Sequence, residues 1–125
     1  MTDKNKIMQM VYKSVSKRVN VTFEQFENIL ENWEFIPLTE NGKLIGSVVK
    51  KDNELHIEYW EKAKSSILRH IRKPLKEAIE KYGFAETYVI ETDNHALNFC
   101  KRLNFIEIGK DNGTILLRCH RSKYA

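Results

Sequence analysis

A long amphipathic helix between two strands, with hairpins before and after it, is the feature that most limits how this chain can fold. The helix is predicted over Ser65–Tyr82, and the strand that follows it over Thr87–Thr92. The apolar stripe of the helix consists of Ile67, Leu68, Ile71, Leu75, Ala78, Ile79 and Tyr82. A crossover helix joins parallel strands, whereas tight turns join antiparallel ones. The combination predicts a mixed α/β (α+β) domain with a mostly antiparallel sheet flanked by helices.

The hairpins are predicted from their turn residues. Asn41-Gly42 is the strongest short hairpin signal, and Lys51–Asn53 and Lys110–Gly113 are the other two turns. The strands that these turns join are predicted at Phe35–Thr39, Lys43–Lys50, Glu54–Trp60, Phe105–Gly109 and Thr114–Cys119. The antiparallel part of the sheet therefore rests on turn chemistry as well as on apolar content.

Thr22 marks a well-defined helix start. Gln25 stands three residues later, which is the spacing of a capping box, and Val21 and Phe26 have the spacing of a hydrophobic staple. The stripe expected to be buried consists of Phe23, Phe26, Ile29, Leu30 and Trp33. Upstream, Ile7–Val15 follows helical spacing; part of it also fits a strand, and the helix is favoured.

The ends of the later helices carry their own signals. Pro74 lies inside the long helix and predicts a kink or a local break, and Gly83 suits its C-terminal end. A shorter helix is predicted over His95–Leu103, capped by Asp93 or Asn94. Asn104 then suits the left-handed residue that ends a helix. The predicted order is α-α-β-β-β-α-β-α-β-β.

The composition is that of one globular domain. The 125 residues, 42% hydrophobic and 30% charged, suit a single domain over 1–125. No apolar run approaches the length of a membrane helix, and no signal peptide is recognisable. Cys100 and Cys119 are too few and too scattered for a disulfide framework or a zinc site. We therefore expect a cytoplasmic protein without a membrane partner or a metal.

The positive charge is concentrated in one segment. The net charge is +4, and Lys62–Lys81 holds a clear excess of lysine and arginine over glutamate. Such a helix could face phosphates of a nucleic acid or of a nucleotide cofactor. A solvated helix face is the alternative interpretation.

The segment Thr92–Gly109 carries a family resemblance. It resembles the C-terminal motif of the GNAT enzymes, the acetyl-CoA-dependent N-acetyltransferases, in which Asn-x-x-Ala-x-x-Phe-Tyr-x-x-x-Gly-Phe precedes a hydrophobic strand. Asn94, Phe99 and Phe105 match in residue type, and Ala96 lies close to the usual alanine position. The order of elements from Thr22 onward is also similar to that of the family.

The resemblance implies a binding site for acetyl-CoA as co-substrate. In the family, the pantetheine arm pairs with two neighbouring strands, which here would be the strand ending at Trp60 and the strand Thr87–Thr92. The pyrophosphate would rest on the N-terminus of the long helix. The cofactor-binding residues implied in this way are Trp60, Lys64, Ser65, Ser66, Ile67, Asn94 and Phe99.

Two departures from the family pattern concern the cofactor and the acid. The family's phosphate loop contains glycines, whereas Lys62–Ile67 contains none; serines and lysines could still hold a phosphate, or the loop has lost the cofactor. Cys100 stands where many members have the tyrosine that protonates the leaving thiolate. Cys100 is then either a weak general acid or a small buried hydrophobe.

A carboxylate from the strand before the phosphate loop commonly serves the family as base. Glu58 is the matching candidate, and it shares a strand face with His56 and Trp60. Glu61 is the reserve candidate. The alternative is that Glu58 and His56 lie on a solvated sheet face.

The leading hypothesis is therefore a small acyltransferase that acetylates an amine of unknown identity, with Glu58 and Cys100 as its catalytic candidates. The rival is a catalytically inactive GNAT-like protein that binds a protein or a nucleic acid, similar to the reduced GNAT-like proteins of tailed phages. A basic nucleic-acid-binding module is the third hypothesis. Many GNAT folds dimerise, so a homodimer is a further expectation.

Overall fold

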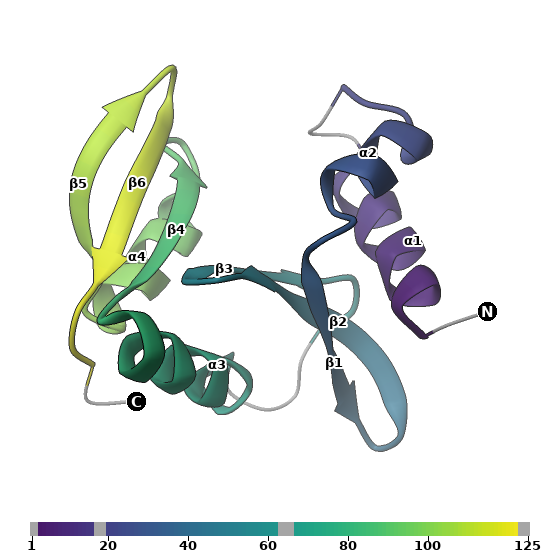
Figure 1. Cartoon of the computed structure of the whole chain (residues 1–125), viewed down its shortest axis with the longest axis horizontal. Coiled ribbons are helices and arrows are strands. Elements are labelled where there is room, and N and C mark those ends of the chain that lie inside the picture. Colours follow the sequence, from purple (N-terminus) through teal and green to yellow (C-terminus); the bar gives the residue numbers. More distant parts are fainter. Residues whose placement is uncertain (1–2, 17–19, 63–66, 123–125) are drawn as a thin grey trace. The chain divides into compact units, whose positions relative to one another are not determined.

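The computed structural model describes residues 3–16, 20–62 and 67–122. The helices in these ranges are α1 (Asp3–Val15), α2 (Phe23–Ile29), α3 (Ile67–Tyr82) and α4 (Asn94–Arg102). The strands are β1 (Glu34–Glu40), β2 (Lys43–Lys51), β3 (Glu54–Tyr59), β4 (Ala85–Ile90), β5 (Ile106–Asp111) and β6 (Thr114–Cys119) (Figure 1). The strand order is β1-β2-β3-β4-β6-β5. The predicted order of elements and the mixed, mostly antiparallel sheet are confirmed.

The chain divides into two compact units. The N-terminal unit comprises Met1–Lys51 and Ile57–His70, and the C-terminal unit comprises Asp52–His56 and Ile71–Ala125. The division falls within β3 and within α3, so each of these elements contributes residues to both units.

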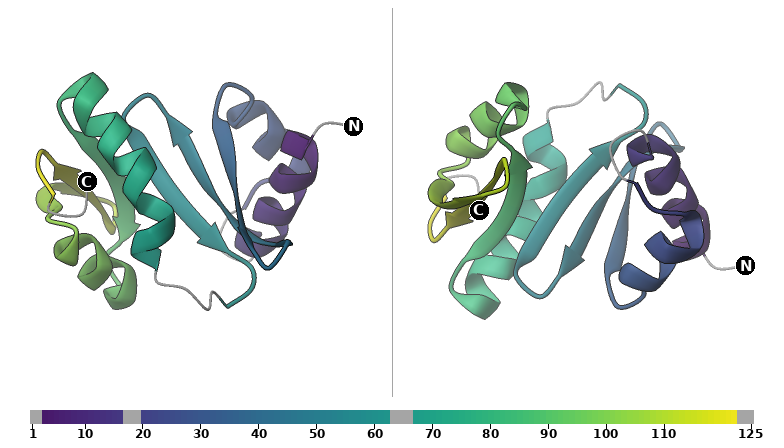
Figure 2. Two further views of the ribbon diagram at one scale, coloured as in Figure 1. Left: turned by 90° about the horizontal axis from the view of Figure 1, so that it is seen from below. Right: turned by 90° about the horizontal axis from the view of Figure 1, so that it is seen from above.

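In the N-terminal unit, α1 and α2 lie side by side and pack against the β1–β2 hairpin (Figures 1 and 2). The buried side chains at this contact are Ile7, Met8, Val11, Phe26, Phe35 and Val49. The Tyr12 ring packs against Phe23 and Phe26, and its hydroxyl donates to the Val21 carbonyl at 2.7 Å. The helix favoured for the opening segment is therefore confirmed, because its apolar face covers the hairpin.

The start of α2 has the predicted capping box. The Thr22 hydroxyl accepts from the Gln25 amide at 3.2 Å, and the Gln25 side chain accepts from the Thr22 amide at 2.9 Å. The expectation that Ile29 is buried is wrong, because its side chain is 62% exposed. Since α2 ends at Ile29 after only two turns, the chain leaves the helix before the apolar stripe can continue.

Two hairpins have the backbone geometry that their sequences predicted. Asn41 and Gly42 have φ angles of 53° and 78°, and Asn112 and Gly113 have φ angles of 49° and 79°. Positive φ at two successive turn residues defines the tight hairpin turn that asparagine and glycine favour. The β1–β2 register is irregular between Leu38 and Thr39.

In the C-terminal unit, β6 pairs antiparallel with both β4 and β5. The start of β3 pairs in parallel with the start of β4, at Glu54 and Glu86, and the Glu86 amide donates to the Asn53 carbonyl at 2.8 Å. The helix α4 lies beside this group of strands (Figure 2). The parallel pair within an otherwise antiparallel sheet is the crossover predicted from the sequence.

The structure also tests the predictions made for the helix and strand ends and for Pro74. The helix α3 continues through the buried Pro74 without a break, and Gly83 ends it with φ 87°. Asp93 caps α4 by accepting from the Ala96 amide at 3.1 Å, which decides between the two predicted caps. The strand β4 ends at Ile90 rather than Thr92 because the Asp93 amide turns back to the Ile90 carbonyl at 2.9 Å.

Two kinds of feature are absent from the described residues. None of their helices combines the length and the apolar character that crossing a membrane requires. They also contain no cluster of three or more His, Cys, Asp or Glu side chains that could hold a metal ion.

Candidate functional site

The end of β3 forms a bulge against β2. The amides of Trp60 and Glu61 both donate to the Ile45 carbonyl, at 3.0 and 3.3 Å. Two residues directly after β3 thus face one residue of β2, which is the arrangement of a β-bulge. Gly46 permits the close approach, since a Cβ there would lie 2.4 Å from the Glu58 carbonyl oxygen. The backbone of β2 is therefore adapted to the position of Glu58.

The Glu58 carboxylate is oriented by a helix of the same unit. The side chain is half-buried, and Ser14 Oγ on α1 donates to Glu58 Oε1 at 2.7 Å. A hydrogen bond from a hydroxyl restricts the rotamers of the carboxylate. An oriented, half-buried carboxylate is suited to accept a proton from a substrate.

His56 and Glu61 are engaged differently from Glu58. His56 Nε2 lies 2.5 Å from Glu54 Oε2, and both side chains are about one-third exposed, at 34% and 30%. Glu61 is 41% exposed and forms an ion pair of 2.8 Å with Lys43. Exposed pairs of this kind contribute little to stability. Because Glu61 is exposed and ion-paired whereas Glu58 is half-buried, Glu58 is the better candidate base.

Trp60 packs against the core of the N-terminal unit and is hydrogen-bonded within that unit. Its indole Nε1 donates to the Leu44 carbonyl at 3.1 Å, and its ring packs against the buried cluster formed by α1, α2 and the first hairpin. The indole N–H is therefore already engaged. A contact between Trp60 and a cofactor would have to use the ring or the backbone.

The residues implied for the pyrophosphate are described only in part. Lys64, Ser65 and Ser66 lie outside the described residues, and Ile67 is the first residue of α3 with only its backbone described. The first turn of α3 contains no acidic residue. Near this end, one face of the helix exposes Arg69, Arg72 and Lys73. A helix N-terminus without carboxylates and with nearby cations is suited to an anionic group such as a diphosphate.

The remaining candidates lie on α4 in the C-terminal unit. Asn94 is the first residue of the helix and is exposed. Phe99 is half-buried, and the Arg102 guanidinium lies 5.8 Å from the centroid of its ring. Both side chains are reachable from solvent, as a contact with a cofactor requires.

Cys100, by contrast, is enclosed. Its side chain belongs to the core with 8% of the residue exposed. Burial, and to a lesser extent the negative charges of Asp93 and Cys119, raise the pKa of the Cys100 thiol to about 11. The thiol is therefore protonated at neutral pH and is a poor proton donor.

The structure distributes the candidates between the two units. Glu58 and Trp60 belong to the N-terminal unit, whereas Asn94, Phe99 and Cys100 belong to the C-terminal unit. Sequence reasoning missed Ser14, because a serine on an amphipathic helix carries no signal for a partner in a distant strand. It also missed a group formed by Glu40, Tyr59 and His70, since no spacing rule connects residues so far apart.

Comparison with solved structures identifies the fold. The chain matches the Campylobacter jejuni N-acetyltransferase PseH with a TM-score of 0.69 and 14% identity, over 98% of this chain and 93% of that one. PseH in complex with acetyl coenzyme A gives a TM-score of 0.67 at 14% identity, over 98% and 94% of the chains. A GNAT-family acetyltransferase from Listeria monocytogenes gives 0.65 at 18% identity, over 94% and 87%. Neither a family model nor a curated protein matches the sequence. The chain therefore has the GNAT fold.

Proposed function

We propose that this protein is an acyltransferase that moves an acetyl group from acetyl-CoA to an amine, with Glu58 as the general base. The observation that carries the proposal is the half-buried carboxylate of Glu58, which lies on β3, the strand that leads to α3. Ser14 on α1 donates a hydrogen bond to this carboxylate. The GNAT fold, which PseH shares, supports acetyl-CoA as the acyl donor.

In this proposal, residues at the start of α3 hold the anionic end of coenzyme A. Lys62 is exposed, and we assign it to the pyrophosphate together with Lys64, Ser65, Ser66 and the amide of Ile67. Asn94 and Phe99 are assigned to the same cofactor from α4. Acetyl-CoA, when bound, supplies an acetyl group activated as a thioester.

Glu58 is assigned one proton transfer. As the amine nitrogen bonds to the acetyl carbon, it loses a proton, and the bond from that carbon to sulfur breaks. Glu58 accepts the proton, directly or through a water molecule. Ser14 keeps the carboxylate in the orientation that this transfer requires.

Cys100 is assigned to packing rather than to acid catalysis. A thiol in water has a pKa of about 8.5, whereas burial raises the pKa of Cys100 to about 11. Proton transfer from Cys100 to an ordinary thiolate is therefore uphill. The departing thiolate takes its proton from another source, such as solvent.

The experiment that tests the proposal measures thiol release from acetyl-CoA with a panel of amines: spermidine, an amino sugar and a peptide with a free N-terminus. We expect release that depends on one of these amines, with one acetyl group gained by that amine in mass spectrometry. Glu58→Gln should remove most of the release, and Glu61→Gln on the neighbouring exposed residue should not. Equal release by the wild type and Glu58→Gln would contradict the assignment of the base.

A GNAT-fold binding protein without catalysis is the second candidate function. The burial of Cys100 and the absence of glycine from Lys62–Ile67 favour it. This candidate predicts no heat of acetyl-CoA binding.

The exposed basic face of α3 could bind nucleic acid in such a protein. Fluorescence anisotropy of a labelled duplex should then show binding that weakens with salt. The triple change Arg69→Gln, Arg72→Gln and Lys73→Gln should abolish this binding.

A further inference from the structure

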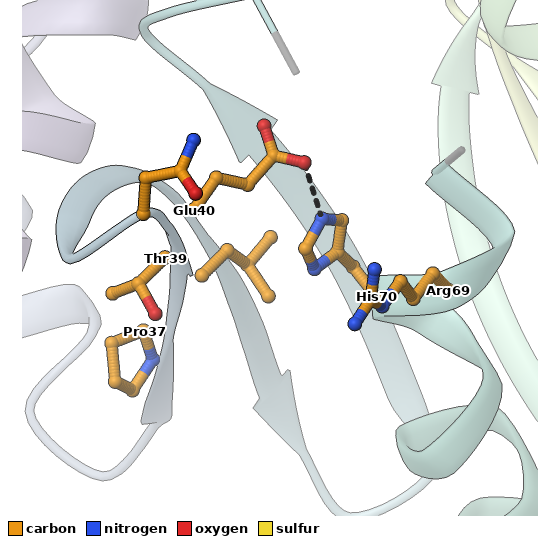
Figure 3. Close-up of a pocket in the computed structure, with 7 residues that line it drawn as sticks. Pro37, Thr39, Glu40, Arg69 and His70 are labelled. Atoms are coloured by element: carbon orange, nitrogen blue, oxygen red, sulfur yellow. Dashed lines mark ion pairs between the residues drawn. The ribbon is translucent and has the colours of Figure 1, made fainter. Parts of the chain in front are cut away.

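A cavity of about 440 Å³ lies in the N-terminal unit between the end of β1 and the start of α3 (Figure 3). Its lining residues are Pro37, Leu38, Thr39, Glu40, Asn41, Arg69 and His70. The volume falls within the range typical of small-molecule sites. All the lining residues belong to one unit, so the cavity is a feature of that unit alone.

Two ionisable side chains meet in the cavity although both are largely buried. His70 Nε2 lies 3.8 Å from Glu40 Oε2, and the side chains are only 10% and 12% exposed. Figure 3 shows the imidazole of His70 and the carboxylate of Glu40 directed toward each other. The distance is too long for a direct hydrogen bond. His70 Nε2 therefore receives no direct hydrogen bond from the Glu40 carboxylate.

Two buried polar atoms in this neighbourhood lack a hydrogen-bond partner among the described residues. They are His70 Nε2 and the hydroxyl oxygen of Tyr59, and the two rings contact edge to face with centroids 6.1 Å apart. Burial, followed by the Glu40 charge, raises the pKa of Tyr59 to about 12. Buried polar atoms are almost always satisfied in native proteins, so the cluster points to a polar ligand.

The charges of the cavity wall favour a ligand that carries both signs. Glu40 supplies a carboxylate, and Arg69, which is exposed beside His70, supplies a guanidinium. A simple cation would be repelled by Arg69, and a simple anion would be repelled by Glu40. A zwitterion satisfies both groups. Pro37 and Leu38 add an apolar part to the same wall.

We propose that this cavity binds a free α-amino acid with an apolar side chain. The ammonium group donates to the Glu40 carboxylate and to His70 Nε2, in the tautomer with the proton on Nδ1. The carboxylate pairs with the Arg69 guanidinium, and the side chain lies on Pro37 and Leu38.

This site is separate from the proposed acetyl-transfer chemistry. Tyr59, which contacts His70, is the neighbour of Glu58 in β3. Successive residues of a strand point to opposite faces of a sheet. An amino acid in the cavity is therefore on the opposite face of β3 from the Glu58 side chain, and the inference does not depend on the proposed function.

The test is an NMR titration of the full chain with L-norleucine. We expect saturable shifts of the Thr39 and Asn41 amides and of the His70 imidazole in the millimolar range. n-Pentylamine lacks the carboxylate of norleucine, and hexanoate lacks its ammonium group. Each should bind about tenfold more weakly, because each loses one charged hydrogen-bonding group.

Variants make the same test from the side of the protein. Glu40→Gln and Arg69→Gln should each weaken norleucine binding about tenfold, whereas Lys76→Gln, further along α3, should not change it. Arg69 is exposed, so Arg69→Gln provides a folded variant even if Glu40→Gln does not fold. Three results would overturn the proposal: no saturable shift with norleucine, binding of either analogue as tight as that of norleucine, or unchanged affinity in Arg69→Gln.

Discussion

Glu58 and Cys100 are the base and acid candidates that the sequence resemblance implies, yet they occupy opposite kinds of environment. Glu58 is half-buried and accepts a hydrogen bond of 2.7 Å from Ser14. Cys100 is enclosed by the core, and its pKa is raised to about 11. The Glu58 side chain is partly accessible to solvent, whereas the Cys100 thiol is shielded and its raised pKa keeps it protonated at neutral pH.

The difference shows that a position in a motif does not by itself define a chemical role. Cys100 stands at the position of the family's acid, but burial makes a thiol there a packing residue. Glu58 matches no strict motif, but its surroundings orient it as a base would be oriented. The local environment of each side chain is therefore the basis for the role that we propose for it. Variants at or near Glu58 and Cys100 test the two roles separately.

The largest effect is expected for Glu58→Gln. The amide keeps the shape of the side chain but cannot accept a proton, so kcat for amine acetylation should fall about 100-fold or more. Steady-state kinetics with the acceptor found in the amine screen measure this loss. Glu61→Gln is the control, and a comparable loss in the control would remove the special role of Glu58.

The second largest effect is expected for Gly46→Ala. A methyl group there would lie 2.4 Å from the Glu58 carbonyl oxygen, and relieving such a contact should cost about 2 kcal/mol of unfolding free energy. Urea denaturation measures the change. Gly109→Ala is the matched control, because a Cβ at Gly109 has no neighbour within 4 Å. Equal stability of the two variants would show that the bulge tolerates a side chain.

A smaller effect is expected for Ser14→Ala. Loss of one hydrogen bond to the Glu58 carboxylate is worth about 1 kcal/mol, so kcat should fall about fivefold with little change in KM. Ser16→Ala is the control, since Ser16 donates to the Lys13 carbonyl and not to β3. If kcat stays at the wild-type value in Ser14→Ala, the hydrogen bond does not position the base.

The smallest effect on activity is expected for Cys100→Ala. Acetylation should stay within about twofold of the wild type, and the unfolding free energy should fall by about 1 kcal/mol because a buried sulfur is removed. The same kinetic and denaturation measurements compare the variant with Glu58→Gln. A large loss of kcat without a loss of stability would restore Cys100 as a catalytic acid.

The Cys100 thiol also predicts a pH dependence of stability. Its pKa is raised from 9.0 to about 11 in the folded chain, so the folded state holds its proton more tightly than the unfolded state. Its contribution is therefore complete below about pH 9 and is lost as the pH rises toward about 11. Thermal unfolding of the wild type and Cys100→Ala over this range should converge as the pH rises. A constant difference would mean that the thiol is not shielded.

Much of the fold was predictable because it depends on local chemistry. The Thr22 capping box, the Asn41-Gly42 turn and the left-handed Asn104 follow from residue type and short spacing. The burial of Ile29 was predicted wrongly, because periodicity alone does not reveal where a helix stops. The order of elements is robust, whereas element ends depend on tertiary contacts.

The candidate site was predictable only in part. Glu58 could be selected by its strand face, but the Ser14 partner is 44 residues away in the sequence, and no spacing rule joins an α-helix to a distant strand. The meeting of Glu40 with His70 is hidden for the same reason. The shift of the Cys100 pKa depends on enclosure by the core, which a motif does not encode.

Calorimetric titration with acetyl-CoA tests the central claim most directly. The account predicts micromolar binding by the wild type and much weaker binding by the double variant Ser65→Asp and Ser66→Asp, because the added carboxylates repel the pyrophosphate. Lys76→Gln should bind like the wild type. The absence of heat at millimolar acetyl-CoA would contradict the account and leave a GNAT fold that no longer uses this co-substrate.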